Sequence, residues 1–353
     1  MPFREVVGHR KLVALLARAV QHGSLPPSLI LAGPTGVGKR LLALATAQAL
    51  NCPNVEHRAS NVERGTSNVE HRTPNEAVLL DACGSCATCT RIVRGVHPDV
   101  LIVEPGDSGT IKVDQVRDLI ERAAYRPFEG RLRVVVIDEA DALVPAAQNA
   151  LLKTLEEPPS LSVFMLITSR PDALLPTVRS RCPRLRFRPL GPDDVAAALV
   201  QRGRTQFEAR LIAATAAGSV GRALEGRAGD LGEARDVAVR VLSQAASNDD
   251  PRRRIEGATD LLAKTGRGGA GDREHLASEL RAMASLIRDV ELLSTSADSR
   301  ALANPDVQPA IERLSAYRGE RGIRAFTAVD RALAALDRNA GVKVVADWIL
   351  LQL

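Results

Sequence analysis

The chain has 353 residues, of which 45% are hydrophobic and 25% charged, the balance of an ordinary soluble protein with two or three domains. No uncharged apolar run approaches the roughly 18 to 20 residues that a membrane span needs, and the first residues lack the apolar segment of a signal peptide. We therefore expect a cytoplasmic protein. The formal net charge of +5 permits a nucleic-acid partner but does not identify one.

The first predicted elements form a phosphate-binding unit. Apolar periodicity predicts a helix over residues 11–22, followed by a strand over Ser28–Ala32, a glycine-rich turn and a helix over 39–50. This order is typical of a P-loop, in which glycines let backbone N–H groups face an anion and the helix N-terminus and a lysine add positive charge. The residues predicted to bind phosphate are Gly33, Pro34, Thr35, Gly36, Val37, Gly38 and Lys39.

The residue after Lys39 departs from the P-loop pattern. This position is normally Ser or Thr, whose hydroxyl binds Mg²⁺, but here it is Arg40. A cationic side chain cannot replace an oxygen ligand. We therefore expect ATP and Mg²⁺ to bind weakly or not at all; nucleotide binding without turnover is the alternative.

Residues 54–74 form a polar repeat of period seven with one apolar residue in each repeat. A coiled coil needs two apolar positions per heptad, so we expect an inserted, exposed and mobile loop. A metal role for His57 and His71 is the alternative.

Four cysteines predict a metal site. Cys83, Cys86 and Cys89 have two Cys-x2-Cys spacings, and Cys52 lies before the repeat. Disulfides are not expected in a cytoplasmic protein. Four thiolates can close a tetrahedral structural Zn²⁺ site, and an iron–sulfur cluster or unligated thiols are the alternatives.

Three strands, of which the last two are expected to be buried, then alternate with two helices along the chain, at 99–103, 113–124, 132–141, 145–157 and 162–168. This alternation predicts a parallel sheet with helices on both sides. After a short strand at 184–187 the pattern is helical. We expect an α/β domain over 1–173 and two all-α parts over 174–228 and 229–353.

Acidic residues are predicted to lie beside the P-loop. Asp138 and Glu139 follow a buried strand, at the sheet edge where the P-loop also lies. In such a site Asp138 would hold Mg²⁺ and Glu139 would orient or deprotonate the attacking water. Thr168 ends the next strand, where its hydroxyl could approach a γ-phosphate. Acidic residues at the exposed end of a buried strand, without a catalytic role, are the alternative.

An arginine-rich segment predicts contact with an anion. Six arginines and one acid lie between residues 170 and 188, and Arg181 is flanked by Ser180 and Cys182. Arginine is suited to stabilising the charge that develops in phosphoryl transfer, and can act from a neighbouring subunit. Arg222, near the start of a later helix, could also reach a bound phosphate. Taken singly, either arginine could be an ordinary surface residue.

Together these motifs resemble the AAA+ subunits of the bacterial replicative clamp loader, and within that family the delta-prime type of DNA polymerase III. The resemblance spans roughly residues 3–226 and rests on six motifs: Val7–His9, Gly33–Lys39, the cysteine set, Ile137–Asp141, Leu151–Pro159 and Ser180–Cys182. It implies a P-loop domain with a five-stranded parallel sheet, a small helical lid and an all-α collar domain for oligomerisation.

The resemblance also implies a function. In that family a five-subunit ring, with gamma/tau and delta as the other subunit types, opens a sliding clamp and places it on primer-template DNA. The gamma/tau subunits hydrolyse ATP and delta-prime contributes an arginine finger, which here corresponds to Arg181; Thr168 and Arg222 correspond to the two sensor positions. With Arg40 in the P-loop, we expect a ring scaffold and finger donor.

Other functions remain open at this point. The chain could instead be an ATP-hydrolysing gamma/tau-type motor, or another AAA+ DNA-remodelling ATPase such as a branch-migration helicase. A purely structural zinc protein is a third alternative. No separate set of carboxylates is placed for nucleotidyl transfer, so any DNA polymerase activity would belong to partner proteins.

Overall fold

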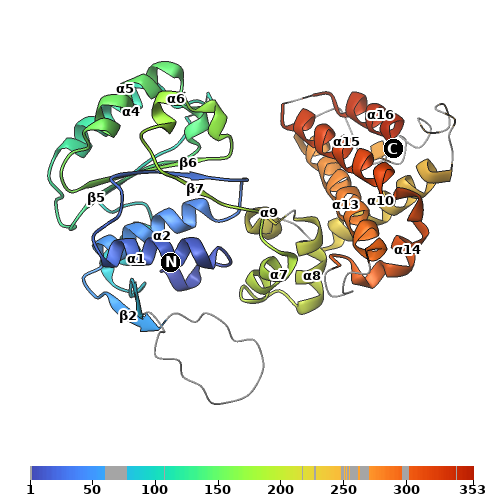
Figure 1. Cartoon of the computed structure of the whole chain (residues 1–353), viewed down its shortest axis with the longest axis horizontal. Helices are drawn as coiled ribbons and strands as arrows, with labels where there is room; N and C mark the ends of the chain where they lie inside the picture. The colour runs from blue at the N-terminus through green and yellow to red at the C-terminus, as the bar shows by residue number, and fades with distance from the viewer. Residues whose placement is uncertain are drawn as a thin grey trace, which may run out of the picture. The chain divides into compact units, whose positions relative to one another are not determined.

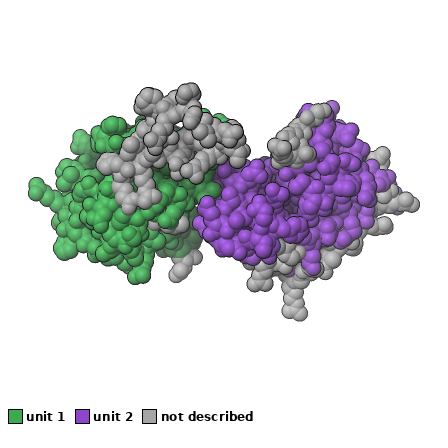
Figure 2. All heavy atoms as spheres, turned by 90° about the horizontal axis from the view of Figure 1, so that it is seen from below, with its two compact units in different colours: residues 1–189 green, residues 190–353 purple. Residues whose placement is uncertain are grey.

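The computed structural model describes residues 2–59, 78–106, 108–216, 218–225, 228–247, 270–295, 302–338 and 340–353, with a few single positions between 250 and 262. The chain divides into two compact units, residues 1–189 and 190–353 (Figure 2). Among the described residues, no helix is both long enough and apolar enough to cross a membrane.

The first unit is built on a five-stranded parallel sheet in the order β4-β5-β6-β1-β7. Every residue of the three inner strands is buried, as their continuous apolar sequences require. The sheet confirms the predicted α/β fold class. Its strands are β1 (Ser28–Ala32), β4 (Val100–Val103), β5 (Arg133–Ile137), β6 (Ser162–Thr168) and β7 (Arg184–Arg186).

Helices cover both faces of this sheet (Figure 1). Successive residues of β1 point to opposite faces, so Leu29 and Leu31 enter one hydrophobic core and Ile30 enters the other. The first core includes side chains from η1 (Phe3–Glu5), α1 (Arg10–Gln21), α2 (Lys39–Asn51) and α3 (Ala87–Val93). The second includes side chains from α4 (Val113–Ala124), α5 (Pro145–Glu156) and α6 (Pro176–Arg179). The result is a three-layer α/β/α arrangement.

Two segments differ from the sequence-based description. The first unit extends to Pro189, because β7 pairs with β1, so residues 174–189 lie with the sheet rather than with a helical part that begins at 174. Within the predicted loop over 54–74, β2 (Glu56–Ala59) pairs antiparallel with β3 (Val78–Asp81). The strand partner lies beyond the repeat, so the repeat period alone could not indicate it. Residues 60–77, including His71, lie outside the described residues.

The second unit is helical throughout its described residues and has two hydrophobic cores. The smaller core is formed around α7 (Pro192–Val200), α8 (Gln206–Thr215) and α9 (Val220–Glu225). The larger core surrounds Tyr317, which is fully buried and donates its hydroxyl to the Leu242 carbonyl at 3.2 Å. This core is formed by α10 (Ala228–Ser247), α13 (Ala270–Ser294), α14 (Gln308–Arg313), α15 (Glu320–Asp337) and α16 (Val342–Gln352). The predicted all-α character of the later chain is confirmed.

A buried carboxylate fixes the loop that leads into β5. Asp99, directly before β4, is fully buried and accepts hydrogen bonds from the backbone N–H groups of residues 128, 129 and 130 at 2.7, 2.9 and 2.8 Å. It also accepts a hydrogen bond from Arg133 Nη2 at 2.8 Å. Burial alone would raise the pKa of Asp99, but these donors lower it to about 2. The loop is therefore anchored by an ionised group inside the unit.

Candidate nucleotide and metal sites

The glycine-rich loop connects β1 to α2 with the backbone that an anion site requires. Gly36 and Gly38 have φ angles of 72° and 98°, which favour glycine, and Gly38 directly precedes the first turn of α2. A Cβ on Gly33 would lie 2.5 Å from the carbonyl oxygen of Phe187, the residue after β7, so a side chain cannot be placed there without displacement. The loop is held tightly against the end of the sheet.

Lys39 is directed into this loop. The residue is buried, with an exposure of 6%, and its Nζ donates to the carbonyl oxygens of Gly33 at 2.6 Å and Pro34 at 2.5 Å. Burial lowers the pKa of Lys39, while the nearby carboxylate of Asp138 acts in the opposite direction. The lysine therefore bonds to the loop itself, and its amine lies where it could turn to a phosphate oxygen.

Arg40 forms ion pairs with two carboxylates from neighbouring strands. Its Nη1 lies 3.1 Å from Oδ2 of Asp138, the residue after β5, and also contacts Glu104, the residue after β4. Asp138 was predicted from the sequence and Glu104 was not, although Glu104 is also an acidic residue at the carboxyl end of a strand. The predicted metal-binding carboxylate is thus already paired with the cation that replaces the P-loop hydroxyl.

Thr168 lies near this edge, but its hydroxyl is engaged. The residue is fully buried and its Oγ1 donates to Asp141 at 2.8 Å. Asp141 also accepts hydrogen bonds from Arg170 Nε at 3.0 Å and from the Ser169 N–H at 3.2 Å. Burial by itself would raise the pKa of Asp141, but these hydrogen-bond donors lower it. Glu139 is exposed, with a left-handed φ of 50°.

The two predicted arginines lie in different units. Arg181 follows α6 in the first unit, where it pairs with Glu156 at the end of α5 and donates to the Thr177 carbonyl at 2.8 Å. Its side chain is 31% exposed. Arg222 lies on α9 in the second unit, where its backbone N–H donates to Ser219 Oγ at 3.2 Å. The sheet edge of the first unit contains the P-loop and Asp138.

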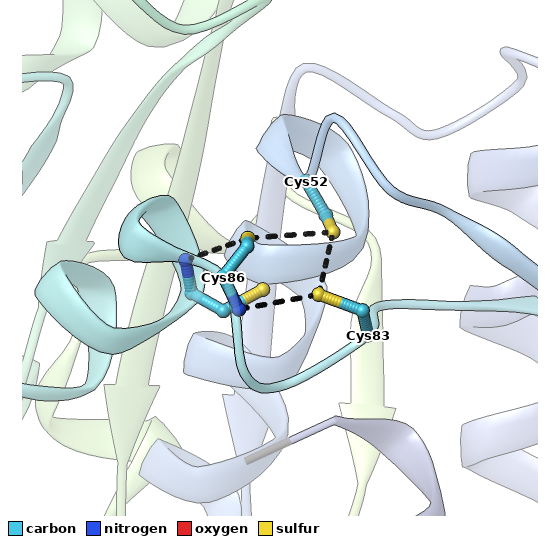
Figure 3. Close-up of side chains that lie close together, drawn as sticks. Cys52, Cys83 and Cys86 are labelled. Atoms are coloured by element: carbon cyan, nitrogen blue, oxygen red, sulfur yellow. Dashed lines mark hydrogen bonds between the residues drawn. The ribbon is translucent and has the colours of Figure 1, made fainter.

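The four predicted cysteines come together in the first unit, and Figure 3 shows three of them, Cys52, Cys83 and Cys86. Cys52 directly follows α2, Cys83 follows β3, and Cys86 and Cys89 lie at the start of α3. The Sγ atom of Cys52 lies 3.6 Å from that of Cys83 and 3.9 Å from that of Cys86, and all four Sγ atoms lie within 4.8 Å of one another. These separations exclude disulfide bonds, in which the sulfurs are about 2 Å apart.

The cysteine cluster fits one tetrahedral metal ion. Four sulfurs at about 2.3 Å from a central zinc lie about 3.8 Å from one another, close to the observed separations. The compact arrangement suits a single ion better than a cluster of several irons. Inclusion of Cys52, which the repeat separates from the other three in the sequence, completes a four-thiolate set.

Hydrogen bonds to the sulfurs and to the cysteine backbone hold the cluster in place. The N–H of Cys86 donates to the Cys83 sulfur at 3.4 Å, and the N–H of Cys89 donates to the Cys86 sulfur at 3.4 Å. Burial raises the pKa of Cys52 and of Cys89; at Cys83 burial is outweighed by donors that include the Cys86 N–H, and the pKa is lowered to about 6. Gln48 and Arg131, which the sequence analysis missed, bond to the carbonyls of Cys89 and Cys52 at 2.8 and 2.7 Å.

Comparison with known families identifies the first unit. The model of the family described as DNA polymerase III, delta subunit matches residues 8–191, more than half of the chain. The chain belongs to this family. The match covers the P-loop, the cysteine cluster and Arg181, and it confirms the predicted resemblance at the level of the family.

Curated relatives of this family member are DNA polymerase III subunits. Subunit delta′ of Pseudomonas aeruginosa is 38% identical over 154 residues, which are 43% of this chain and 40% of that protein. Subunit gamma/tau of Mycobacterium tuberculosis is 33% identical over 199 residues, which are 56% of this chain and 31% of that protein. Subunit tau of Escherichia coli is 31% identical over 193 residues, which are 55% of this chain and 26% of that protein. The chain spans less than half the length of each.

Solved structures with a similar course of the chain include a DNA polymerase III gamma subunit-related protein of Thermotoga maritima. It is 17% identical, with a TM-score of 0.44, and the alignment covers 95% of this chain and 96% of that one. The RuvB Holliday junction branch migration motor of Thermotoga maritima is 15% identical, with a TM-score of 0.39 and 87% of each chain covered.

Proposed function

We propose that this chain is a delta-prime-type subunit of the DNA polymerase III clamp loader. In this role it is a scaffold of the ring and donates Arg181 to the ATP site of a neighbouring subunit. The observation that carries the proposal is the contrast between two arginines. Arg40 is paired with two carboxylates, Asp138 and Glu104, at the chain's own P-loop, whereas Arg181 lies outside that loop, after α6, and pairs with the single carboxylate of Glu156.

The pairing at Arg40 argues against ATP hydrolysis by this chain. Hydrolysis by P-loop proteins needs Mg²⁺ held by the hydroxyl after the lysine and by an acidic residue on another strand of the sheet. Here the hydroxyl is absent and Asp138 already accepts a hydrogen bond from Arg40 at 3.1 Å. Thr168, the predicted first sensor, donates to Asp141 rather than standing free. Arg222 would act as a second sensor from the helical part of the chain.

The arrangement at Arg181 supports action on a partner's nucleotide. Its guanidinium pairs with Glu156 and one carbonyl at the surface of the first unit. A γ-phosphate presented by a neighbouring subunit could replace Glu156 as its anionic partner, and arginine fingers supplied in this way typically raise the rate 10³- to 10⁵-fold. The partners of the subunit would be gamma/tau and delta, with the sliding clamp and primer-template DNA as the substrates of the whole loader in the cytoplasm.

The cysteine cluster would hold a structural Zn²⁺. Cys52, Cys83, Cys86 and Cys89 would supply four thiolates, leaving no open position for catalysis. Bound there, the ion would tie the end of α2 to β3 and α3, which the chain otherwise connects through the repeat.

Reconstituted clamp loaders test the role of Arg181. With gamma/tau and delta subunits present, Arg181→Ala is expected to lower DNA- and clamp-stimulated ATP hydrolysis at least tenfold, and Arg181→Lys is expected to restore only part of it because lysine lacks the planar fork. Arg179→Ala is the matched control, because Arg179 is a similarly exposed arginine that pairs with Asp172. An unchanged rate with Arg181→Ala in an assembled ring would refute the proposal.

An ATP-hydrolysing gamma/tau-type motor is the second candidate. It is favoured by the retained Lys39 and Asp138 and by the gamma/tau relatives. This candidate predicts ATP hydrolysis by the isolated chain in the presence of primed DNA. Our proposal predicts a rate indistinguishable from that of a Lys39→Ala variant.

A further inference from the structure

The P-loop of this chain carries its own cation at the place where other P-loop proteins hold a metal. In those proteins Mg²⁺ lies between the hydroxyl that follows the lysine and an acidic residue at the end of another strand of the sheet. In this chain the residue that follows the lysine is Arg40, and its Nη1 reaches that acidic residue, Asp138, at 3.1 Å. Glu104 closes the arrangement from the next strand.

These residues do not fit Mg²⁺. The ion prefers six oxygen ligands in octahedral geometry, and a guanidinium has no lone pair to offer. Oδ2 of Asp138 already accepts a hydrogen bond from Arg40, and Oε1 of Glu104 is ion-paired with it. A divalent ion would also have to approach a fixed positive charge that is in contact with those carboxylates. The site is therefore unfavourable to the metal for both geometric and electrostatic reasons.

The groups that bind phosphate remain in place. Gly36 and Gly38 keep the loop in its anion-facing conformation. The helix α2 has thirteen residues, so the unpaired N–H groups of its first turn and its helix dipole both favour an anion at the loop. Lys39 needs only to exchange the two loop carbonyls for phosphate oxygens. The Arg40 side chain is 48% exposed, and its five donors allow it to bond a phosphate while it keeps one carboxylate.

We propose that this P-loop is a metal-independent site for a chain of phosphates, in which the Arg40 guanidinium takes the place of Mg²⁺. The proposal rests on the proposed function, in which this chain is a scaffold subunit that does not hydrolyse ATP. Such a subunit would keep its bound phosphate ligand without turnover. The ligand is a metal-free nucleoside triphosphate or an inorganic oligophosphate. Because Arg40 and Mg²⁺ compete for one place, Mg²⁺ weakens binding instead of supporting it.

Fluorescence anisotropy of a labelled ATP analogue with the full chain tests this proposal. In EDTA the analogue is expected to bind, and excess Mg²⁺ is expected to weaken binding at least fivefold. Arg40→Thr restores the hydroxyl and removes the cation, so the sign should reverse and Mg²⁺ should strengthen binding. Arg117→Thr is the matched control, because Arg117 is an exposed arginine on α4 that pairs with Asp114, and it should behave as the unmodified chain.

Several outcomes would overturn the proposal: no binding with or without Mg²⁺, binding that Mg²⁺ strengthens or leaves unchanged in the unmodified chain, or binding that survives Lys39→Ala. Competition by inorganic tripolyphosphate would support recognition through the phosphates, and would indicate an oligophosphate source if it equals that by ATP. Competition by adenosine alone would contradict the proposal. The ATPase assay with Arg181→Ala is independent of all these measurements, so a failure here is distinguishable from failure of the proposed function.

Discussion

Replacing the buried carboxylate of Asp99 tests the reasoning on the first unit most directly. Asp99→Asn keeps the shape of the side chain but removes the charge that holds three backbone N–H groups and Arg133. A tenfold change in proton affinity corresponds to about 1.4 kcal/mol. Lowering the pKa from the ordinary 3.8 to about 2 therefore stabilises the folded unit by about 2 kcal/mol.

At neutral pH, Asp99→Asn should lower the free energy of unfolding by more than this amount. The Arg133 side chain is only 9% exposed, so removal of its partner leaves a buried charge unpaired. Breaking a buried ion pair in this way typically costs about 3 to 5 kcal/mol. We expect the free energy of unfolding to fall by about 3 kcal/mol. Asp114→Asn is the control: Asp114 is 86% exposed and pairs with Arg117 at 3.5 Å, and its loss should cost less than about 1 kcal/mol.

The pH dependence has a defined sign. Because the folded pKa of Asp99 is lowered, its contribution is complete above pH 3.8 and is lost as the pH falls through about 2. Urea unfolding followed by circular dichroism should therefore show a difference between the unmodified chain and Asp99→Asn that is constant above about pH 4 and shrinks below it. The fluorescence of Trp348, the one tryptophan, follows the second unit separately. A loss below about 1 kcal/mol at pH 7, or a difference independent of pH from 4 to 2, would refute the reasoning.

Two further predictions concern the cysteine cluster and the P-loop. Cys83→Ser should reduce the zinc that copurifies with the chain, measured by mass spectrometry, from about one ion per chain to less than half, whereas Cys182→Ser should leave it unchanged; equal retention in both would contradict the zinc assignment. Gly33→Ala should lower the free energy of unfolding by about 1 to 3 kcal/mol in urea titrations, because its Cβ would meet the Phe187 carbonyl at 2.5 Å. Gly106→Ala, with nothing within 4 Å, should change it by less than about 0.5 kcal/mol, and an equal effect at both positions would rule out the steric explanation.

The elements that were predictable from the sequence are those specified by local chemistry. β1 and β6 have the predicted bounds, Ser28–Ala32 and Ser162–Thr168, because each is a run of apolar residues long enough to be buried on both faces. The bounds of α4, Val113–Ala124, also agree, since its apolar residues recur at helical spacing. β2 was not predictable, because its partner β3 lies beyond the repeat and pairing across such a distance leaves no local pattern.

The candidate site divides in the same way. Glycine positions, Lys39, the Cys-x2-Cys spacings and the missing hydroxyl at Arg40 are properties of short stretches, and the sequence by itself determined them. Only the tertiary structure decided what Arg40 contacts, since Asp138 lies 98 residues away and meets it through the order of the strands. It likewise decided that Cys52 completes the set of four thiols across 31 residues, because such contacts depend on how distant strands and helices pack.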